Sequence, residues 1–244
     1  MSLALCDVHS SRLEESATSA REFSESGHLV TTHLVDVGDS TQVESLAKDV
    51  LASHGRVTLL INNAGVALHG DFNELSLGDF EWLMRANFWG VVNCAKIFLP
   101  ILCRETRAHM VNVSSIFGIV APPGQTAYAA SKFAIRGFTE ALRHELAESN
   151  VGVSCVHPGG IRTRIAEDGR MGSAASGTRE TYAAVFSRVA RHSPEFAAKK
   201  ILEGVKRNKR RILIGSEAYA LDALERLTPG RIAGAIRTGA STRH

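Results

Sequence analysis

The stretch Met110-Val-Asn-Val-Ser114 decides the fold, and Leu59-Leu-Ile-Asn62 and Val153-Ser-Cys-Val156 repeat its pattern. Each is a short and nearly continuous apolar run, without the strict alternation expected of a sheet with one wet face. Strands that are covered by helices on both faces have this composition. The three runs therefore predict buried parallel strands.

Helical segments separate the predicted strands, which is typical of parallel β-α-β units. We therefore expect one α/β domain over residues 1–244. The expected strands are Leu3–Cys6, Leu29–Val35, Val57–Ile61, His109–Val113, Val151–Val156 and Arg211–Ile214. The expected helices are Ser11–Ser26, Thr41–Ser53, Leu77–Phe98, Thr126–Ser149 and Pro194–Arg207.

Local signals predict where two of these helices begin and end. Thr41 and Glu44 have the spacing of a capping box, and Gly55 is expected to end the helix that they start. Ser76 with Asp79 predicts a second capped start.

Composition limits the class of protein. Hydrophobic residues make up 44% of the chain and charged residues 22%, as in a soluble globular domain. No apolar run approaches the roughly 20 residues of a membrane span. The apolar start Met1–Cys6 is too short for a secretory signal and lacks its basic start. Four scattered cysteines without a C-x-x-C pair favour reduced thiols over disulfides or zinc. We therefore expect a cytoplasmic protein with no transmembrane segment and no metal.

The C-terminal third has two further features. Residues 166–193 contain glycine and serine without a clear period, which predicts a substrate lid with short helices. Residues 216–244 are expected to form a C-terminal extension. Residues 199–244 contain 11 Lys and Arg and 4 Asp and Glu. This excess would suit a nucleic-acid or anionic membrane surface, or a solvated helix end. We favour the solvated helix end and expect no nucleic-acid partner.

The segment Tyr128-Ala-Ala-Ser-Lys132 carries the chemistry. Residues four apart lie on one face of a helix, so the phenol and the ammonium can share one site. The cation then favours the phenolate and lowers the pKa of the tyrosine from about 10. Such a tyrosine can exchange a proton with a substrate hydroxyl or carbonyl. Alone, however, Y-x-x-x-K also fits a core tyrosine beside a solvated lysine.

Four companions strengthen the catalytic interpretation. Ser115 ends one predicted buried strand, and Asn62-Asn63-Ala64-Gly65 ends another. Ligands bind at the carboxyl ends of parallel strands. Asn87 lies in the middle of a predicted helix, where asparagine is unfavourable unless its amide has a partner. Pro158-Gly159-Gly160-Ile161-Arg162-Thr163 follows a third strand and offers a tight loop with free backbone groups.

These motifs, in this order and spacing, resemble the short-chain dehydrogenase/reductase family from Leu3 to about Gly215. The resemblance implies a Rossmann-like doubly wound parallel sheet. It also implies an oxidoreductase that transfers hydride between NAD(P) and an alcohol or carbonyl substrate, with Tyr128 as general acid and base. Lys132 would lower the pKa of that tyrosine and hold the nicotinamide ribose. Ser115 would bind the reacting oxygen, and Asn87 would anchor a proton-relaying water chain.

The resemblance also implies a set of cofactor-binding residues in addition to Tyr128 and Lys132. They are Asp7, Asp36, Val37, Asn63, Ala64, Gly65, Pro158, Gly159, Ile161 and Thr163. Among them, Asp7 would select the cofactor because it ends the first predicted strand. A carboxylate there accepts hydrogen bonds from a ribose 2′-hydroxyl and repels a 2′-phosphate. We therefore expect NAD rather than NADP. The alternative is a plain surface aspartate after a strand.

One part of the family pattern is missing from this sequence. The family's first strand, its T-G-x-x-x-G-x-G turn and its first helix should precede Leu3, and no such glycine fingerprint occurs in the chain. We therefore expect a sheet without its first β-α unit and without the amides that bind a pyrophosphate. Two hypotheses follow. In the first, the natural start lies upstream and the protein is an ordinary dehydrogenase. In the second, the chain is a weak or inactive relative that serves as a binding or oligomerisation module.

Partners are predicted more loosely. The substrate is expected to be a small lipophilic alcohol or ketone, because apolar residues lie near the motifs. These residues are Phe117, Ile119, Val120, Ala121 and Met171. The resemblance implies a homodimer or homotetramer built on the two long helices. The apolar residues expected to need cover there are Phe80, Phe133, Phe138 and Leu142.

Overall fold

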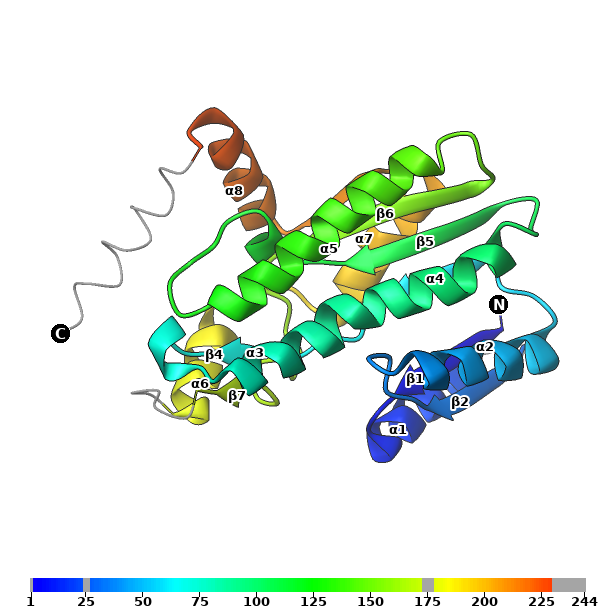
Figure 1. The fold of residues 1–244 in the computed structure, drawn as a ribbon, viewed down its shortest axis with the longest axis horizontal. Coiled ribbons are helices and arrows are strands. Elements are labelled where there is room, and N and C mark those ends of the chain that lie inside the picture. The colour runs from blue at the N-terminus through cyan, green and yellow to red at the C-terminus, as the bar shows by residue number, and fades with distance from the viewer. Residues whose placement is uncertain (1, 24–26, 173–177, 230–244) are drawn as a thin grey trace.

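A computed structural model describes residues 2–23, 27–172 and 178–229. Strands alternate with helices along the chain, and the layers are visible in Figure 1. The strands are β1 (Leu3–Asp7), β2 (Val30–Leu34), β3 (Leu59–Asn62), β4 (Leu68–His69), β5 (Ala108–Val113), β6 (Val151–Pro158), β7 (Arg170–Met171) and β8 (Arg211–Ile214). The α-helices are α1 (Ser10–Glu22), α2 (Ser40–His54), α3 (Leu77–Met84), α4 (Gly90–Leu102), α5 (Thr126–Glu145), α6 (Arg179–Val189), α7 (Pro194–Lys206) and α8 (Ser216–Leu227).

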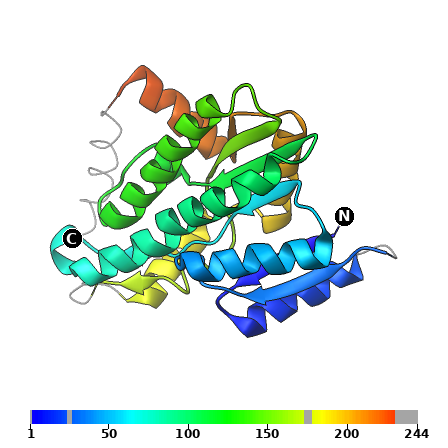
Figure 2. The same cartoon turned by 45° about the vertical axis from the view of Figure 1, so that its right-hand side comes forward.

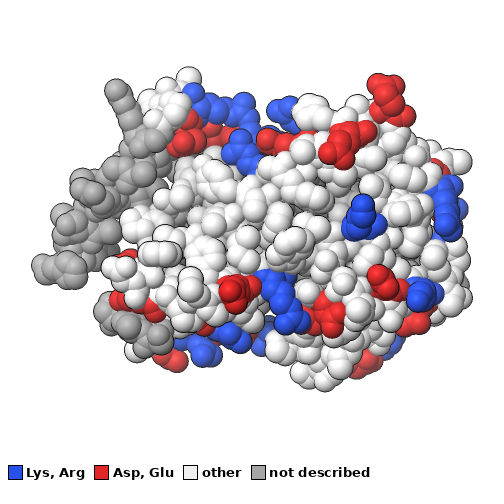
Figure 3. Space-filling model, in the orientation of Figure 1, with Lys and Arg blue, Asp and Glu red and all other residues white. Residues whose placement is uncertain are grey.

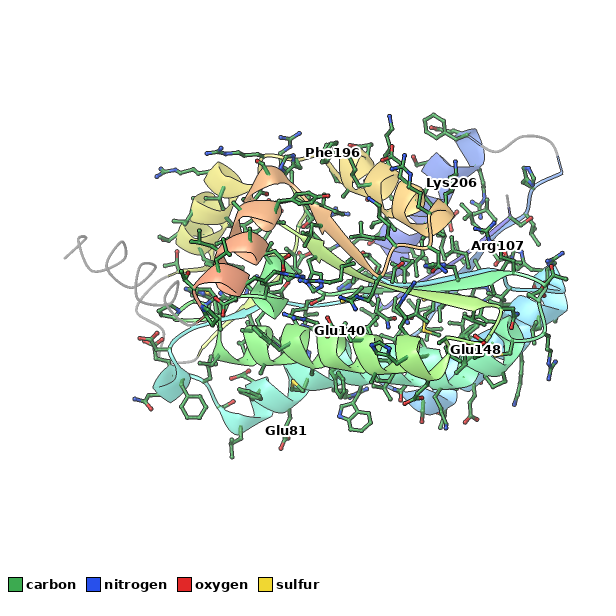
Figure 4. The ribbon with its side chains drawn as sticks, turned by 90° about the horizontal axis from the view of Figure 1, so that it is seen from above. Glu81, Arg107, Glu140, Glu148, Phe196 and Lys206 are labelled. Atoms are coloured by element: carbon green, nitrogen blue, oxygen red, sulfur yellow. The ribbon has the colours of Figure 1, made fainter. Side chains whose placement is uncertain are left out.

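The main sheet has four parallel strands in the order β3-β5-β6-β8. Helices α4 and α5 cover one face and α7 covers the other, as the view from above shows (Figure 4). The predicted α/β fold with a parallel sheet is therefore confirmed. Strands β5 and β6 are almost entirely buried, as their apolar runs predict. Strand β3 is less covered because it lies at the edge of this sheet, and Ile61 there remains 41% exposed.

Strands β1 and β2 form a separate parallel pair. Within the described residues β1 pairs only with β2, and β3 pairs only with β5, so each has one unpaired edge. The β1-β2 pair and helices α1 and α2 lie beside the main sheet (Figure 2). An apolar cluster holds them there, in which Val43 and Val50 of α2 share the core with Cys94 and Phe98 of α4.

Three sequence predictions of local structure need correction. Helix α2 is capped by Asp39 rather than Thr41, because the Asp39 carboxylate accepts from the amides of residues 41 and 42. The long helix predicted from Leu77 to Phe98 is broken by a π-helical segment, Arg85–Trp89, and then continues to Leu102. Helix α5 ends at Glu145, four residues early. The predicted lid contains β7 and the 11-residue helix α6; its residues 173–177 lie outside the described part.

The predicted C-terminal extension begins with α8, and residues 230–244 lie outside the described part. None of the described helices is long and apolar enough to cross a membrane. The described residues also contain no group of three or more His, Cys, Asp or Glu side chains that could hold a metal ion.

Candidate active site

Tyr128 and Lys132 lie on one face of α5, near its start, beside the carboxyl ends of the main strands. The Lys132 Nζ lies 5.5 Å from the centre of the Tyr128 ring and donates a hydrogen bond to the Val113 carbonyl at 3.1 Å. Lys132 is only 3% exposed, which is rare for a lysine unless it has partners. The helical spacing therefore brings the two groups together as predicted.

The direction of the pKa shift at Tyr128 is opposite to the sequence prediction. Burial raises the pKa of Tyr128 to about 12, although a hydrogen bond from Ser115 acts in the lowering direction and Tyr182 adds to the rise. Burial also lowers the pKa of Lys132 to about 8. Desolvation disfavours the charged form of both groups, and in the protein alone it outweighs any help from the ammonium. Tyr128 is therefore a protonated phenol at neutral pH.

Ser115 is placed by the turn that follows β5. Its Oγ accepts from the Phe117 amide at 3.1 Å and takes part in a hydrogen bond with Tyr128. The preceding residue, Ser114, points elsewhere, since its Oγ donates to the Lys132 carbonyl at 2.8 Å. The alternation of side chains along an extended chain therefore separates a serine directed at the site from one that ties the strand to α5.

Asn87 sits in the π-helical segment and is fully buried. Its Oδ1 accepts from the Val66 amide at 2.7 Å, and its Nδ2 donates to the Val66 carbonyl at 3.0 Å and to Ser131 Oγ at 3.1 Å. The side chain thus fixes the loop that follows β3. Single π turns are often found at functional sites. Gly65 fits closely here, because a Cβ at that position would lie 3.2 Å from Asn87 Oδ1.

The residues predicted to border the adenosine half of a cofactor lie on the β1-β2 side and on the loop after β3. Asp7 ends β1, and its Oδ1 accepts from the His9 amide at 2.8 Å. Asp36 forms an ion pair with Arg85 and accepts from the Gly38 amide. Val37 lies beside Asp36 and packs partly against the cluster between α2 and α4. The exposed loop residues are Asn63, Ala64 and Gly65.

The loop after β6 is held by a carboxylate. Glu217 Oε1 accepts from the Gly160 amide at 3.0 Å, and a Cβ on Gly159 would lie 2.0 Å from the same oxygen. Only glycine fits at position 159 with this carboxylate in place. Pro158 ends β6, Ile161 is 8% exposed and pairs with His192, and Thr163 is exposed.

Comparisons with known proteins agree with this arrangement. The sequence model of the short chain dehydrogenase family matches residues 1–173. The chain belongs to the short chain dehydrogenase family. It is 42% identical over 228 residues to the protein named "Putative oxidoreductase SadH" of Mycobacterium tuberculosis, covering 92% of this chain and 81% of that protein. It is 36% identical over 169 residues to the 3-ketodihydrosphingosine reductase of Bacteroides thetaiotaomicron, covering 69% of this chain and 62% of that one.

A solved structure shows the same fold. A short chain dehydrogenase/reductase from Burkholderia phymatum, in complex with NAD, has a TM-score of 0.83 and 31% identity, covering 93% of this chain and 84% of that chain. Relatives of this chain are thus oxidoreductases of the short chain dehydrogenase family, and structural neighbours bind nicotinamide cofactors. This supports a dehydrogenase or reductase that uses such a cofactor.

The catalytic end of the site fits the nicotinamide riboside of a short chain dehydrogenase cofactor. The buried Lys132 ammonium has three donors, and its recorded hydrogen bond goes to the Val113 carbonyl. A Cβ on Gly65 would stand 3.5 Å from that ammonium, so glycine keeps open the space beside it. The pyrophosphate end fits less well, since the chain contains no glycine-rich turn of the T-G-x-x-x-G-x-G type.

Sequence reasoning missed a polar cluster next to Tyr128. Gln125 Nε2 approaches His69 Nδ1 at 2.7 Å and donates to the Tyr182 hydroxyl at 3.2 Å. The His69 and Tyr182 rings stack with their centres 4.2 Å apart. This cluster joins α6 to the start of α5. Gln125 stands three residues before Tyr128 in the sequence, but nothing there announces its partners, which come from β4 and α6.

One predicted feature of the substrate site also changes. Ile119 and Val120 are buried in a cluster with Leu213 and Leu221, so they belong to the core rather than to an open pocket. A hollow of about 300 Å³ lies between β2 and α2. Its lining residues are His33, Leu34, Val35, Thr41, Gln42, Ser45, Leu46 and Asp49. None of its lining residues is a catalytic candidate.

Proposed function

We propose that the protein transfers hydride between NAD(H) and an alcohol or carbonyl carbon, with Tyr128 as general acid and base. The observation that carries this proposal is the convergence of Tyr128, Ser115 and Lys132. Ser115 hydrogen-bonds Tyr128, and the Lys132 ammonium lies 5.5 Å from the centre of the phenol ring. A proton source, a hydrogen-bond donor and a fixed cation are the groups that carbonyl reduction needs.

In the direction of reduction, Tyr128 supplies the proton. The phenol is protonated at neutral pH because burial raises its pKa to about 12. When bound, the nicotinamide supplies the hydride that reaches the carbonyl carbon. The carbonyl oxygen takes the Tyr128 proton, and Ser115 Oγ donates a hydrogen bond to that oxygen. The phenolate that remains is stabilised by the Lys132 cation, whose position is fixed before the reaction begins.

Asn87 is proposed to anchor the water chain that returns a proton to Tyr128. Its carboxamide is engaged by Val66 and Ser131, so it also holds the loop after β3 in place. That loop contributes Asn63, Ala64 and Gly65 to the proposed cofactor channel. Asp36 and Val37 would border the adenine end. The nicotinamide end would be bordered by Pro158, Gly159, Ile161 and Thr163.

Asp7 is proposed to select NAD over NADP. It ends β1 at the carboxyl edge of that strand, and its Oδ1 accepts from the His9 amide. This leaves Oδ2 for a ribose hydroxyl, and the negative charge repels a 2′-phosphate. The NAD bound to the Burkholderia phymatum relative supports the same choice.

We propose further that one more parallel strand belongs between β1 and β3. Each has one unpaired edge within the described residues, and such an edge offers free amide and carbonyl groups with which another strand can pair. A strand followed by a glycine-rich turn would complete the sheet and provide amides for the cofactor phosphates. The alternative is that this chain binds cofactor weakly or not at all and serves as a binding or oligomerisation module. DNA in frame upstream of Met1 that encodes such a strand and turn would decide for the first reading.

The substrate is proposed to be a small lipophilic alcohol or ketone. The Bacteroides thetaiotaomicron relative is named a 3-ketodihydrosphingosine reductase, a name that denotes reduction of a keto group. The experiment is a panel of ketones and alcohols followed by the absorbance of the reduced nicotinamide, with calorimetric titration of NAD alongside. The proposal is supported if a ketone causes consumption of the reduced nicotinamide and if a Ser115→Ala substitution lowers the rate of that consumption by about a hundredfold. The absence of both NAD binding and turnover of every member of the panel would favour the binding module.

A further inference from the structure

His157 is a buried polar residue that the proposed reaction does not use. It lies near the end of β6, has 0% exposure, and its ring has two nitrogens in different situations. Nδ1 is 3.0 Å from the main-chain carbonyl oxygen of Ser115. Nε2 is buried and has no hydrogen-bond partner among the described residues. Since a carbonyl oxygen only accepts, Nδ1 must carry the hydrogen.

The contact falls where the pairing of β5 with β6 stops. The Ser114 amide donates to the Val156 carbonyl at 2.8 Å, which is the last recorded hydrogen bond between these strands. The next rung of a parallel ladder would run from the amide of residue 158 to the Ser114 carbonyl. Residue 158 is proline and has no amide hydrogen. The main chain of Ser115 therefore lies just beyond the reach of the sheet.

The His157 side chain takes over at that point. The Ser115 carbonyl receives two donors, the Gly118 amide at 3.0 Å and His157 Nδ1 at 3.0 Å. The Ser115 Oγ accepts a hydrogen bond from the Phe117 amide. The amides come from the turn itself, whereas His157 belongs to β6, a buried strand of the main sheet. Among the described residues, the His157 imidazole is thus the side chain whose hydrogen bond links the Ser115 carbonyl to the sheet.

The surroundings keep this ring neutral. Burial lowers the pKa of His157 to about 4; Arg211 and Arg136 act in the same direction, and together they outweigh the raising effects of the hydrogen bond to Ser115 and of Asp222. A neutral ring with its hydrogen on Nδ1 leaves Nε2 as an unpaired acceptor in the core. A buried acceptor without a partner is unfavourable, so an apolar side chain of this size would suit a purely structural position better. The cost at Nε2 suggests that the histidine is kept for the hydrogen bond that Nδ1 donates to the Ser115 carbonyl.

We propose that His157 is a positioning residue that fixes the Ser115 main chain, and through it the Ser115 hydroxyl, for the reaction. This inference rests on the proposed function only for its catalytic consequence. The structural part, a bond from Nδ1 that restrains the turn at residues 115–118, stands independently of any activity.

Three substitutions separate the two nitrogens. The amide nitrogen of asparagine lies close to the position of Nδ1, and that of glutamine lies close to Nε2. His157→Asn keeps the donor to Ser115, whereas His157→Gln and His157→Leu lose it. Hydrogen exchange in a peptide that covers residues 113–120 should be faster by about tenfold in the Gln and Leu variants and near wild type in the Asn variant. Exchange in α2 serves as the internal control and should not change.

The kinetic readout uses the same variants. We expect kcat to fall by about tenfold or more in His157→Gln and His157→Leu with KM little changed, and His157→Asn to recover most of it. Equal exchange at residues 113–120 in the Asn and Gln variants would overturn the inference, and so would a loosened turn with unchanged kcat. A third outcome is faster exchange in the Gln and Leu variants alone, combined with a wild-type protein that turns over no substrate. This would support the restraint on Ser115 and count against the proposed function instead.

Discussion

At the scale of single residues, one cause displaces two pKa values in opposite directions. Burial raises the pKa of Tyr128 to about 12 and lowers that of Lys132 to about 8. Both shifts favour the neutral forms, since a charge loses solvation inside a protein. At neutral pH the phenol therefore holds its proton, and Lys132 is still mainly a cation. This is the charge state that reduction requires.

These values predict the pH dependence of reduction. The proton donor is present throughout the range below about pH 12, so it should not limit the rate. Lys132 loses its proton as the pH rises through about 8, and the phenolate then loses its stabilising cation. The value of kcat for reduction should thus be level below about pH 8 and fall above it. A Lys132→Met variant should be slower and lack this step; a wild-type rate that rises from pH 8 to 10 would contradict the assignment.

Cofactor choice provides a second prediction at this scale. Asp7→Ala removes the carboxylate that would accept from a ribose hydroxyl, so the ratio of kcat/KM for NAD to that for NADP should fall by about tenfold or more. Asp7→Asn keeps the shape but not the charge and should give an intermediate ratio. Measuring both cofactors with one substrate checks this. An unchanged ratio in both variants would remove Asp7 from the selection of cofactor.

Much of the candidate site is readable from residue types and spacing, because helix and strand periods are regular. The pairing of Tyr128 with Lys132 follows from the helical period, and Ser115 follows from the end of an apolar run. The pKa of Tyr128 is not readable, because it depends on how much protein covers the phenol. The contacts of Gln125 and His157 are also hidden, since their partners lie far away in the sequence.

At the scale of elements, boundaries depend on atoms that a pattern does not specify. Thr41 and Glu44 have the right spacing for a capping box, yet Asp39 is the cap because its carboxylate reaches the first free amides. The π turn at Arg85–Trp89 has no counterpart in the spacing of apolar residues. Helix α6 has no fully buried residue. Its apolar residues do recur at helical spacing, at Tyr182, Val185, Phe186 and Val189, but the stretch is short and begins in a segment rich in glycine and serine.

The cap of α2 can be tested through stability. Asp39→Ala removes the acceptor for the amides of residues 41 and 42, which should lower the free energy of unfolding by about 1 kcal/mol. Asp49→Ala removes an exposed aspartate from the same helix and should change it much less. Urea unfolding followed by circular dichroism measures both. Equal losses in the two variants would mean that Asp39 does not cap the helix.

At the scale of the whole molecule, the described strands form a four-stranded sheet and two separate pairs, β1-β2 and β4-β7. Apolar packing between α2 and α4 joins the β1-β2 pair to the four-stranded sheet. Alternating strands and helices are enough to predict the parallel sheet. They do not predict the strand order or the break in it, because pairing between distant strands leaves no local signal.

The broad face over α4 and α5 bears on assembly. Figure 3 shows that few charged side chains occupy the middle of this face. Of the four residues predicted there, Phe133 is 40% exposed, whereas Leu142 is only 8% exposed and belongs to the core. We predict a dimer or tetramer through this face, because exposed apolar patches mark interfaces. Phe133→Asp should shift the protein toward monomer in sedimentation velocity, and Val185→Asp on α6 should not. A wild-type monomer at all concentrations would contradict this.

The comparison that tests the central claim most directly is the rate of ketone reduction in the wild type, Tyr128→Phe and Tyr219→Phe. Tyr219 is 57% exposed on α8, so its hydroxyl has no part in the proposed site. The proton-transfer role predicts that Tyr128→Phe loses about a hundredfold to ten-thousandfold in kcat, while Tyr219→Phe stays near the wild type. A Tyr128→Phe variant that reduces the ketone as fast as the wild type would contradict it.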